Sequence, residues 1–146
     1  AEWDVVCRRV DETEGHIVNV ELEVEANVTI EEINSLLRKN NYSHLSKLPS
    51  SPTTPLIVLE EPPTREVHLW GSSHSPNPDP SQDLLAGMET CVYVEMVEGT
   101  TIKFKALSHN TIRGAAGGVV LLAERAIADG HIPSVDINPS DVSSDW

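Results

Sequence analysis

The stretch that decides the fold is residues 91–107, CVYVEMVEGTTIKFKAL. Apolar side chains occupy every second position on both sides of Gly99, namely Val92, Val94 and Met96, then Ile102, Phe104 and Ala106. A period of two is the pattern of a strand with one buried and one solvated face, and a glycine between two such runs is typical of a tight turn. The stretch therefore predicts a hairpin of Cys91–Glu98 with Thr100–Leu107.

Two more strands and a helix are expected on the N-terminal side of this hairpin. Residues 16–25 alternate in the same way, and residues 3–10 form an apolar run. Between them lies a polar turn, 11–15, whose Gly15 can adopt positive φ. Thr29 followed by Glu32 is a capping box, and the apolar stripe after it predicts an amphipathic helix that ends near residues 40–41.

The middle of the chain is rich in proline, and the C-terminal part begins with a long helix. Residues 43–86 hold most of the ten prolines and two strand candidates, Leu56–Glu60 and Glu66–Trp70, with 72–82 expected to be a mobile loop. A helix is predicted from Asn110-Thr111 to Asp129, stopped by Gly130, and 131–146 are expected to be a loose tail. This order predicts an α+β fold, a mixed or largely antiparallel sheet with helices packed on it, rather than a doubly wound nucleotide fold.

Charge and cysteine usage narrow the classes of function. The formal net charge is −13 and the sequence pI is near 4.7, so nucleic acid and anionic membranes are improbable partners. Without an apolar run of about 18 residues, no membrane span is expected, and a cytoplasmic location is the default. Cys7 and Cys91 lack metal-ligand spacing, which favours buried reduced thiols.

Four groups of residues are weighed as candidates for a site. His16 begins a strand after a glycine turn, where a side chain can project from the rim of a sheet. Arg8 and Arg9 point to opposite faces of one strand: a regular hairpin favours Arg8 as the companion of His16, whereas a bulge favours Arg9. His68, His74 and Asp79 lack the spacing of a metal site, and no metal is expected. The small residues 114–118 favour close helix packing over phosphate binding.

Two motifs resemble aspartate-semialdehyde dehydrogenase, most closely its fungal and archaeal branch. They are Cys7-Arg8-Arg9-Val10 with Gly15-His16, and residues 107–118, LSHNTIRGAAGG, before an Ala/Leu-rich helix. The resemblance implies the fold of the C-terminal catalytic and dimerisation domain of the glyceraldehyde-3-phosphate dehydrogenase-like enzymes, spanning residues 1–146. It also implies a homodimer or higher oligomer, and a cytoplasmic role in lysine, threonine and methionine biosynthesis.

The family reaction is the NADPH-dependent reductive dephosphorylation of aspartyl phosphate to aspartate semialdehyde and phosphate. The resemblance implies that His16 is the acid/base, that Arg9 binds the substrate carboxylate and that Asn110 lies at the NADP site. The family's nucleophilic cysteine and its NADP-binding domain precede the region that this chain resembles, and Glu95-Met96-Val97 replaces a usual Gly-Arg continuation. We therefore expect the isolated chain to be inactive and to bind no cofactor. The alternative is a stand-alone acidic oligomerisation or binding module of the same fold.

Overall fold

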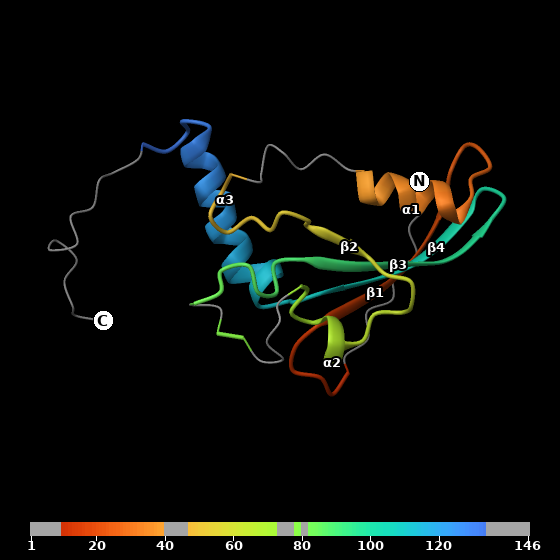
Figure 1. Ribbon diagram of the computed structural model, residues 1–146, viewed down its shortest axis with the longest axis horizontal. Helices are drawn as coiled ribbons and strands as arrows, with labels where there is room; N and C mark the ends of the chain where they lie inside the picture. The colour runs from red at the N-terminus through yellow and green to blue at the C-terminus, as the bar shows by residue number, and fades with distance from the viewer. Residues whose placement is uncertain (1–9, 40–46, 73–77, 80–81, 134–146) are drawn as a thin grey trace, which may run out of the picture.

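A four-stranded sheet with one helix above it forms the centre of the molecule (Figure 1). The computed structural model describes residues 10–39, 47–72, 78–79 and 82–133. The elements in chain order are β1 His16–Glu23, α1 Ile30–Lys39, β2 Leu56–Val58, α2 Arg65–His68, β3 Thr90–Glu98, β4 Thr101–Ser108, the π-helical turn η1 Ile112–Ala116 and α3 Gly117–Ala128. The expected strand 3–10 lies outside the described residues except for Val10, as does the expected tail beyond residue 133.

The sheet is mixed, as predicted. Its strand order is β1-β4-β3-β2, in which β4 pairs antiparallel with both β1 and β3, and β2 pairs parallel with β3. The predicted hairpin is therefore the centre of the sheet, and Gly99 at its turn has φ +61°. The pairing shifts by one residue between Val94 and Met96, where a bulge leaves Glu95 without a partner in the β3–β4 register. The α+β class expected from the sequence is confirmed.

Local sequence signals explain α1 and its place. The backbone N–H of Thr29 donates to Glu32 Oε2 at 2.8 Å, and the N–H of Glu32 donates to Thr29 Oγ1 at 3.2 Å. This reciprocal pair is the capping box that the sequence predicted, and it satisfies donors that the first helical turn leaves free. α1 packs against β2 and β3.

The strand expected at 66–70 is wrong, because residues 65–68 form the short helix α2. A short apolar run is ambiguous between strand and helix, and here tertiary contacts decide. Arg65 and Leu69, four residues apart and so on one helical face, both approach Gly15, within 3.1 Å of where a Cβ atom on that glycine would lie. In an extended chain these two residues would lie about 13 Å apart, too far for both to pack on Gly15.

The predicted C-terminal helix is present, but it begins with a turn of π-helix. η1 continues directly into α3, and Gly130 follows the helix with φ +75°. Gly117 lies against the buried side chain of Met88, so close that an added Cβ would fall 2.5 Å from the Met88 sulfur. The small residues of this segment therefore serve close packing, as expected.

Apolar residues from the hairpin and its flanks form the core. Its buried members are Ala86, Met88, Cys91, Val92, Val94, Ile102, Leu107 and Leu121. The proline-rich segment is tied to α3 by Ser50, whose N–H and hydroxyl donate to the two carboxylate oxygens of Glu124 at 3.0 and 2.8 Å. Among the described residues, no helix is long and apolar enough to cross a membrane.

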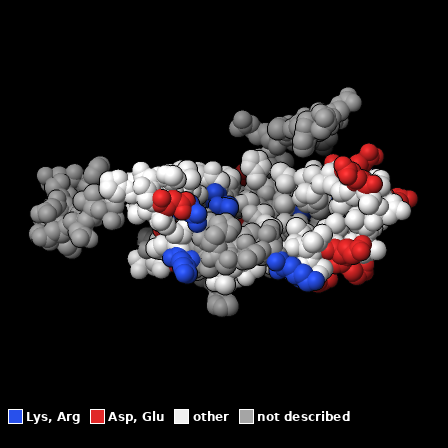
Figure 2. Space-filling model, turned by 90° about the horizontal axis from the view of Figure 1, so that it is seen from above, with Lys and Arg blue, Asp and Glu red and all other residues white. Residues whose placement is uncertain are grey.

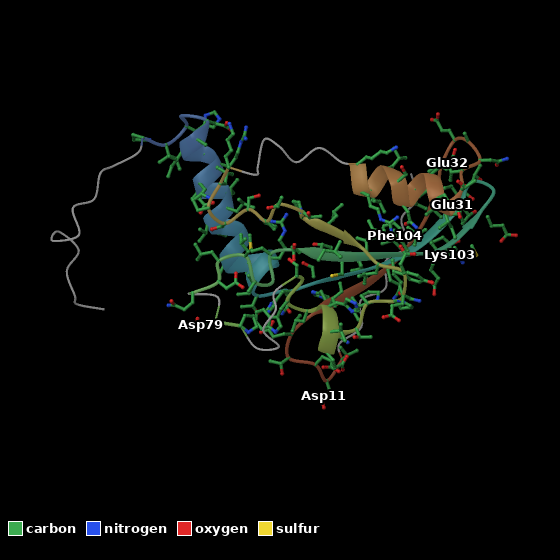
Figure 3. All side chains as sticks on the ribbon, in the orientation of Figure 1. Asp11, Glu31, Glu32, Asp79, Lys103 and Phe104 are labelled. Carbon is green, nitrogen blue, oxygen red and sulfur yellow. The ribbon has the colours of Figure 1, made fainter. Side chains whose placement is uncertain are left out.

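Acidic side chains gather at one end of the sheet. On the face in Figure 2 they cluster at the end opposite α3. Figure 3 places Glu31 and Glu32 there, close to the start of α1, while Asp11 lies at the tip of the loop before β1. The salt bridge of Lys103 Nζ with Glu21 Oε2, at 2.9 Å, offsets part of this charge. The strand ends near α2 are thus separated from the acidic cluster by the length of the sheet.

Gly117→Ala should lower the free energy of unfolding by about 1–3 kcal/mol, the usual cost of overpacking a filled core. Gly114→Ala is the matched control, because the nearest atom to its added Cβ, the His109 carbonyl oxygen, is 3.9 Å away. Alanine there should stabilise the helix by roughly 0.5–1 kcal/mol. Urea unfolding of both variants measures the difference, and equal effects would contradict the contact with Met88.

Candidate active site

The candidate site lies at the edge of the sheet where β1 begins and β4 ends. His16 pairs with Ser108, Ser108 pairs with Thr90, and Thr90 pairs with Leu56, so four strand ends form one row. We call this row, with the segment 109–111 that continues from it, the rim. Residues more than 90 positions apart in the sequence meet there because β1 and β4 are neighbours in the sheet.

His16 is the first residue of β1, and its side chain is exposed. The chain reaches it through Gly15, whose φ of +91° is a conformation that residues with a Cβ rarely adopt. Backbone of this shape turns the loop 11–15 sharply into the strand. The expectation that His16 projects from the rim agrees with its place and exposure.

Asn110 lies beside this histidine. Its Oδ1 accepts a hydrogen bond from the backbone N–H of Gly15 at 2.7 Å, across 95 residues of sequence. The structure thus brings together two of the three site residues expected from the sequence. Arg9 lies outside the described residues, as does Arg8, and the choice between them stays a prediction.

His109 is a site residue that sequence reasoning missed. It is 2% exposed, and its ring packs against Trp70 with the ring centroids 4.5 Å apart. Nδ1 accepts the N–H of Ile112 at 3.4 Å and lies 3.5 Å from Glu14 Oε2. Nε2 has no hydrogen-bond partner within the described structure. The sequence offers no separate signal for it, since a histidine between a strand and a helix is usually solvated.

Burial lowers the pKa of His109, because the charged imidazolium would lose its hydration in the core. The nearby Glu14 carboxylate acts in the opposite direction and favours the charged form. Glu14 is further held by Thr111, whose hydroxyl donates to its carboxylate at 2.7 and 2.9 Å. Neutral His109 therefore belongs to the packing of the rim.

Cys91 is a core residue. Its side chain is buried, and its Sγ donates to the carbonyl oxygen of His68 at 3.6 Å. Desolvation, with a smaller contribution from Glu89, raises the pKa of the thiol to about 11. A nucleophilic cysteine needs its thiolate form near neutral pH, so Cys91 is unsuited to that role. Cys7 lies outside the described residues.

The rim fits at most one end of a dinucleotide cofactor. Asn110 has its amide Nδ2 left to donate once Oδ1 is engaged, which suits a carbonyl acceptor. The glycines that follow do not form a phosphate cradle, because an added Cβ at Gly117 or Gly118 would meet Met88 or the Arg113 carbonyl oxygen at 2.5 Å.

Across the described ranges no cluster of three His, Cys, Asp or Glu side chains could hold a metal, and His68 Nδ1 already accepts the Thr64 N–H at 3.0 Å.

Comparison with known proteins shows which family this chain resembles. Aspartate-semialdehyde dehydrogenase from Aspergillus fumigatus is 33% identical over 134 residues, covering 86% of this chain and 34% of the relative. The enzyme of the same name from Archaeoglobus fulgidus is 33% identical over 126 residues, covering 84% of this chain and 32% of the relative. Over these residues the chain belongs to the aspartate-semialdehyde dehydrogenase family. The chain spans about a third of the length of these two relatives.

A solved structure and a relative named for a different activity also match the chain. The crystal structure of aspartate-semialdehyde dehydrogenase with NADP from Candida albicans matches with a TM-score of 0.54 and 27% identity, covering 81% of this chain and 31% of that chain. Its NADP agrees with the cofactor expected for the family. A malonyl CoA reductase (NADP) from Metallosphaera sedula is 38% identical over 88 residues, covering 59% of this chain and 22% of the relative. No protein-family model matches the chain.

We expect His109 to make stability depend on pH just below neutrality. Because its pKa is lower in the folded state, the unfolded chain binds more protons as the pH falls through the ordinary imidazole value of about 6.5. The stabilisation by neutral His109 is therefore full above that value and is lost as the pH falls through the folded pKa.

Urea unfolding between about pH 7.5 and about pH 5.5 measures this loss, in a window above the titration of ordinary carboxyl groups. His109→Gln should flatten the dependence, whereas His131→Gln, at an exposed histidine, should leave it unchanged. Equal slopes in the wild type and in His109→Gln would show that His109 titrates alike in both states.

Proposed function

We propose that this chain supplies the acid/base residue and the substrate-carboxylate site of an NADP-dependent aspartate-semialdehyde dehydrogenase. The observation that carries the proposal is the 2.7 Å hydrogen bond from Gly15 N–H to Asn110. It joins the two motifs on which the family resemblance rests, the Gly-His pair and the SHNT segment. In this proposal residues 1–146 are the C-terminal catalytic and dimerisation domain, and an NADP-binding domain completes the enzyme.

The chemistry divides between this chain and the proposed partner domain. A cysteine thiolate attacks the acyl carbon of aspartyl phosphate, phosphate leaves and a thioester forms. NADPH, when bound, supplies the hydride that reduces the thioester. The imidazole of His16 donates a proton to the carbonyl oxygen as that oxygen gains charge. It takes the proton back when the carbon–sulfur bond breaks and the aldehyde leaves with the thiolate restored.

Arg9 is the proposed partner of the substrate carboxylate. A planar guanidinium can grip a carboxylate with two parallel charge-assisted hydrogen bonds. In a chain of net charge −13, an anionic substrate needs such a local cation. Glu31 and Glu32 lie at the other end of the sheet, but Glu14 lies at the rim itself, so an anionic substrate there depends on a nearby cation.

Reduction of malonyl CoA is a second candidate, favoured by the 38% identity to the Metallosphaera sedula reductase. Both substrates present a free carboxylate and an activated acyl group, so the roles of Arg9 and His16 serve either. The two reactions differ in the leaving group, which is phosphate in one and the thiol of coenzyme A in the other. Assays with each substrate therefore separate them.

In this proposal the chain alone catalyses no reaction. Cys91 is unsuited to nucleophilic attack, and the glycines after Asn110 are packed against protein atoms rather than open to phosphates. The isolated chain should neither bind NADP nor reduce it with aspartate semialdehyde and phosphate. A cytoplasmic role in amino-acid biosynthesis belongs to the same proposal. The alternative, a stand-alone acidic module, predicts association without turnover in any context.

A homodimer is part of the proposal, and light scattering at micromolar concentration tests it. Val92, Val94 and Ile102 are buried within one chain and are core positions, so they are not available to a dimer interface. The exposed apolar residues of β1 are better candidates, because Val18 and Leu22 share a face and are 47% and 37% exposed. Since each chain is strongly acidic, association should tighten with added salt.

Val18→Lys should shift this dimer toward monomer, whereas Val67→Lys, at a 71% exposed position on α2, should leave the mass unchanged. A mass of 16 kDa for the wild-type chain at every salt concentration would exclude the homodimer.

Arg9→Lys should lower kcat/KM of the complete enzyme by roughly tenfold to a hundredfold. Lysine keeps the charge but loses the two-pronged geometry, at a cost of about 1.5–3 kcal/mol. The assay follows NADP reduction with aspartate semialdehyde and phosphate. Arg8→Lys is the matched control and should change the rate much less. If Arg8→Lys is the damaging change, Arg8 is the residue that faces the substrate.

A further inference from the structure

The residue before His16 is held from both sides. The Gly15 N–H donates to Asn110 Oδ1 at 2.7 Å, and the Gly15 carbonyl oxygen accepts from Arg65 Nε at 3.0 Å. That carbonyl belongs to the peptide whose nitrogen is the backbone nitrogen of His16. Because a peptide unit is planar, fixing its oxygen limits the direction in which the His16 side chain leaves the backbone.

The loop residue one step earlier is held by the same segment that supplies Asn110. Thr111 donates its hydroxyl to the Glu14 carboxylate, and His109 lies 3.5 Å from it. Three successive residues after β4 thus contact two successive residues before β1. His109, buried against Trp70, fixes this segment to the core.

These hydrogen bonds lie just beyond the end of the β1–β4 ladder, where they can affect the orientation of His16 as well as stability. The β1–β4 ladder ends at the pair His16–Ser108, so His16 is a terminal residue of its strand. Terminal pairs of a strand open most easily, since they have neighbours on one side only. The side-chain bonds to Gly15 and Glu14 continue the connection between the two chains past the last ladder pair.

No described carboxylate lies within salt-bridge distance of the Arg65 guanidinium, although the chain is strongly acidic. Within the described part of the chain its guanidinium donates to the Gly15 carbonyl oxygen, and its aliphatic stem packs against the space above that glycine. A charged donor makes a stronger bond to a carbonyl than a neutral donor does. Arg65 therefore serves the Gly15–His16 peptide rather than an ion pair in the described part of the chain.

We propose that Arg65 and Asn110 are positioning residues that clamp Gly15 and thereby set the direction of the His16 imidazole. The value of that direction for proton transfer rests on the proposed function, whereas the clamp itself does not. Asn110 would then act on His16 through the backbone with its Oδ1, in addition to any contact of its Nδ2 with the cofactor. A side chain that moves protons gains rate when it is held in a productive geometry.

The test uses NMR of the 146-residue chain without any substrate. In Asn110→Ala the Gly15 amide should exchange with water roughly three- to tenfold faster, the loss expected for one hydrogen bond. In Asn110→Ala and Arg65→Met the χ1 couplings of His16 should move toward rotamer averaging. The conservative variants Asn110→Asp and Arg65→Lys keep an acceptor and a donor and should restore both signals toward wild type.

Arg113→Met is the matched control, an arginine of η1 with no hydrogen bond or ion pair to residues 14–16 in the described structure, and it should change neither signal. Unchanged Gly15 exchange in Asn110→Ala, or unchanged His16 couplings in both disruptive variants, would overturn the clamp. Turnover by the complete enzyme tests the proposed function separately. If the NMR signals change as expected but the complete enzyme has no turnover, the proposed function is wrong and the clamp stands. If the enzyme turns over but the NMR signals do not change, the positioning roles are wrong and the function stands.

Discussion

The pairing of β4 with strands on both of its sides is the interaction on which the rest of the structure depends. β4 holds β3 through a short turn and β1 across a long stretch of sequence. Its last residue, Ser108, therefore stands between His16 and Thr90, and the chain that leaves it must pass His16. The contact of Asn110 with Gly15 follows from this register, because Asn110 is two residues past the last pair.

Burial decides the chemistry of the titratable groups around this row of strand ends. The thiol of Cys91 and the imidazole of His109 both lie in the core, and desolvation favours the neutral form of each. His16 is exposed at the edge of the sheet, as the proposed proton transfer requires. The two histidines differ in depth, His109 being buried and His16 exposed, and this difference does not depend on a sequence motif.

The exposed apolar surface agrees with a chain that works as part of something larger. α3 buries Leu121 but leaves Val119 and Leu122 more than 60% exposed, and β1 leaves Val18 exposed. The chain spans about a third of its Aspergillus and Archaeoglobus relatives. An interface with a second copy and an interface with an NADP-binding domain are the two proposals that would cover these surfaces.

The sequence by itself determined the elements whose signals are local. Alternation around Gly99 predicted the hairpin, the Thr29–Glu32 box predicted the start of α1, and Gly130 marked the end of α3, because each depends on neighbours within a few residues. It also predicted His16 and Asn110 as site residues, through motifs rather than through their contact. Only the tertiary structure decided that residues 65–68 are helical, that His109 is buried against Trp70, and that Arg65 reaches the Gly15 carbonyl. These features depend on strand register and on packing between residues far apart in the sequence, such as Arg65 and Gly15, 50 positions apart, which no local pattern encodes.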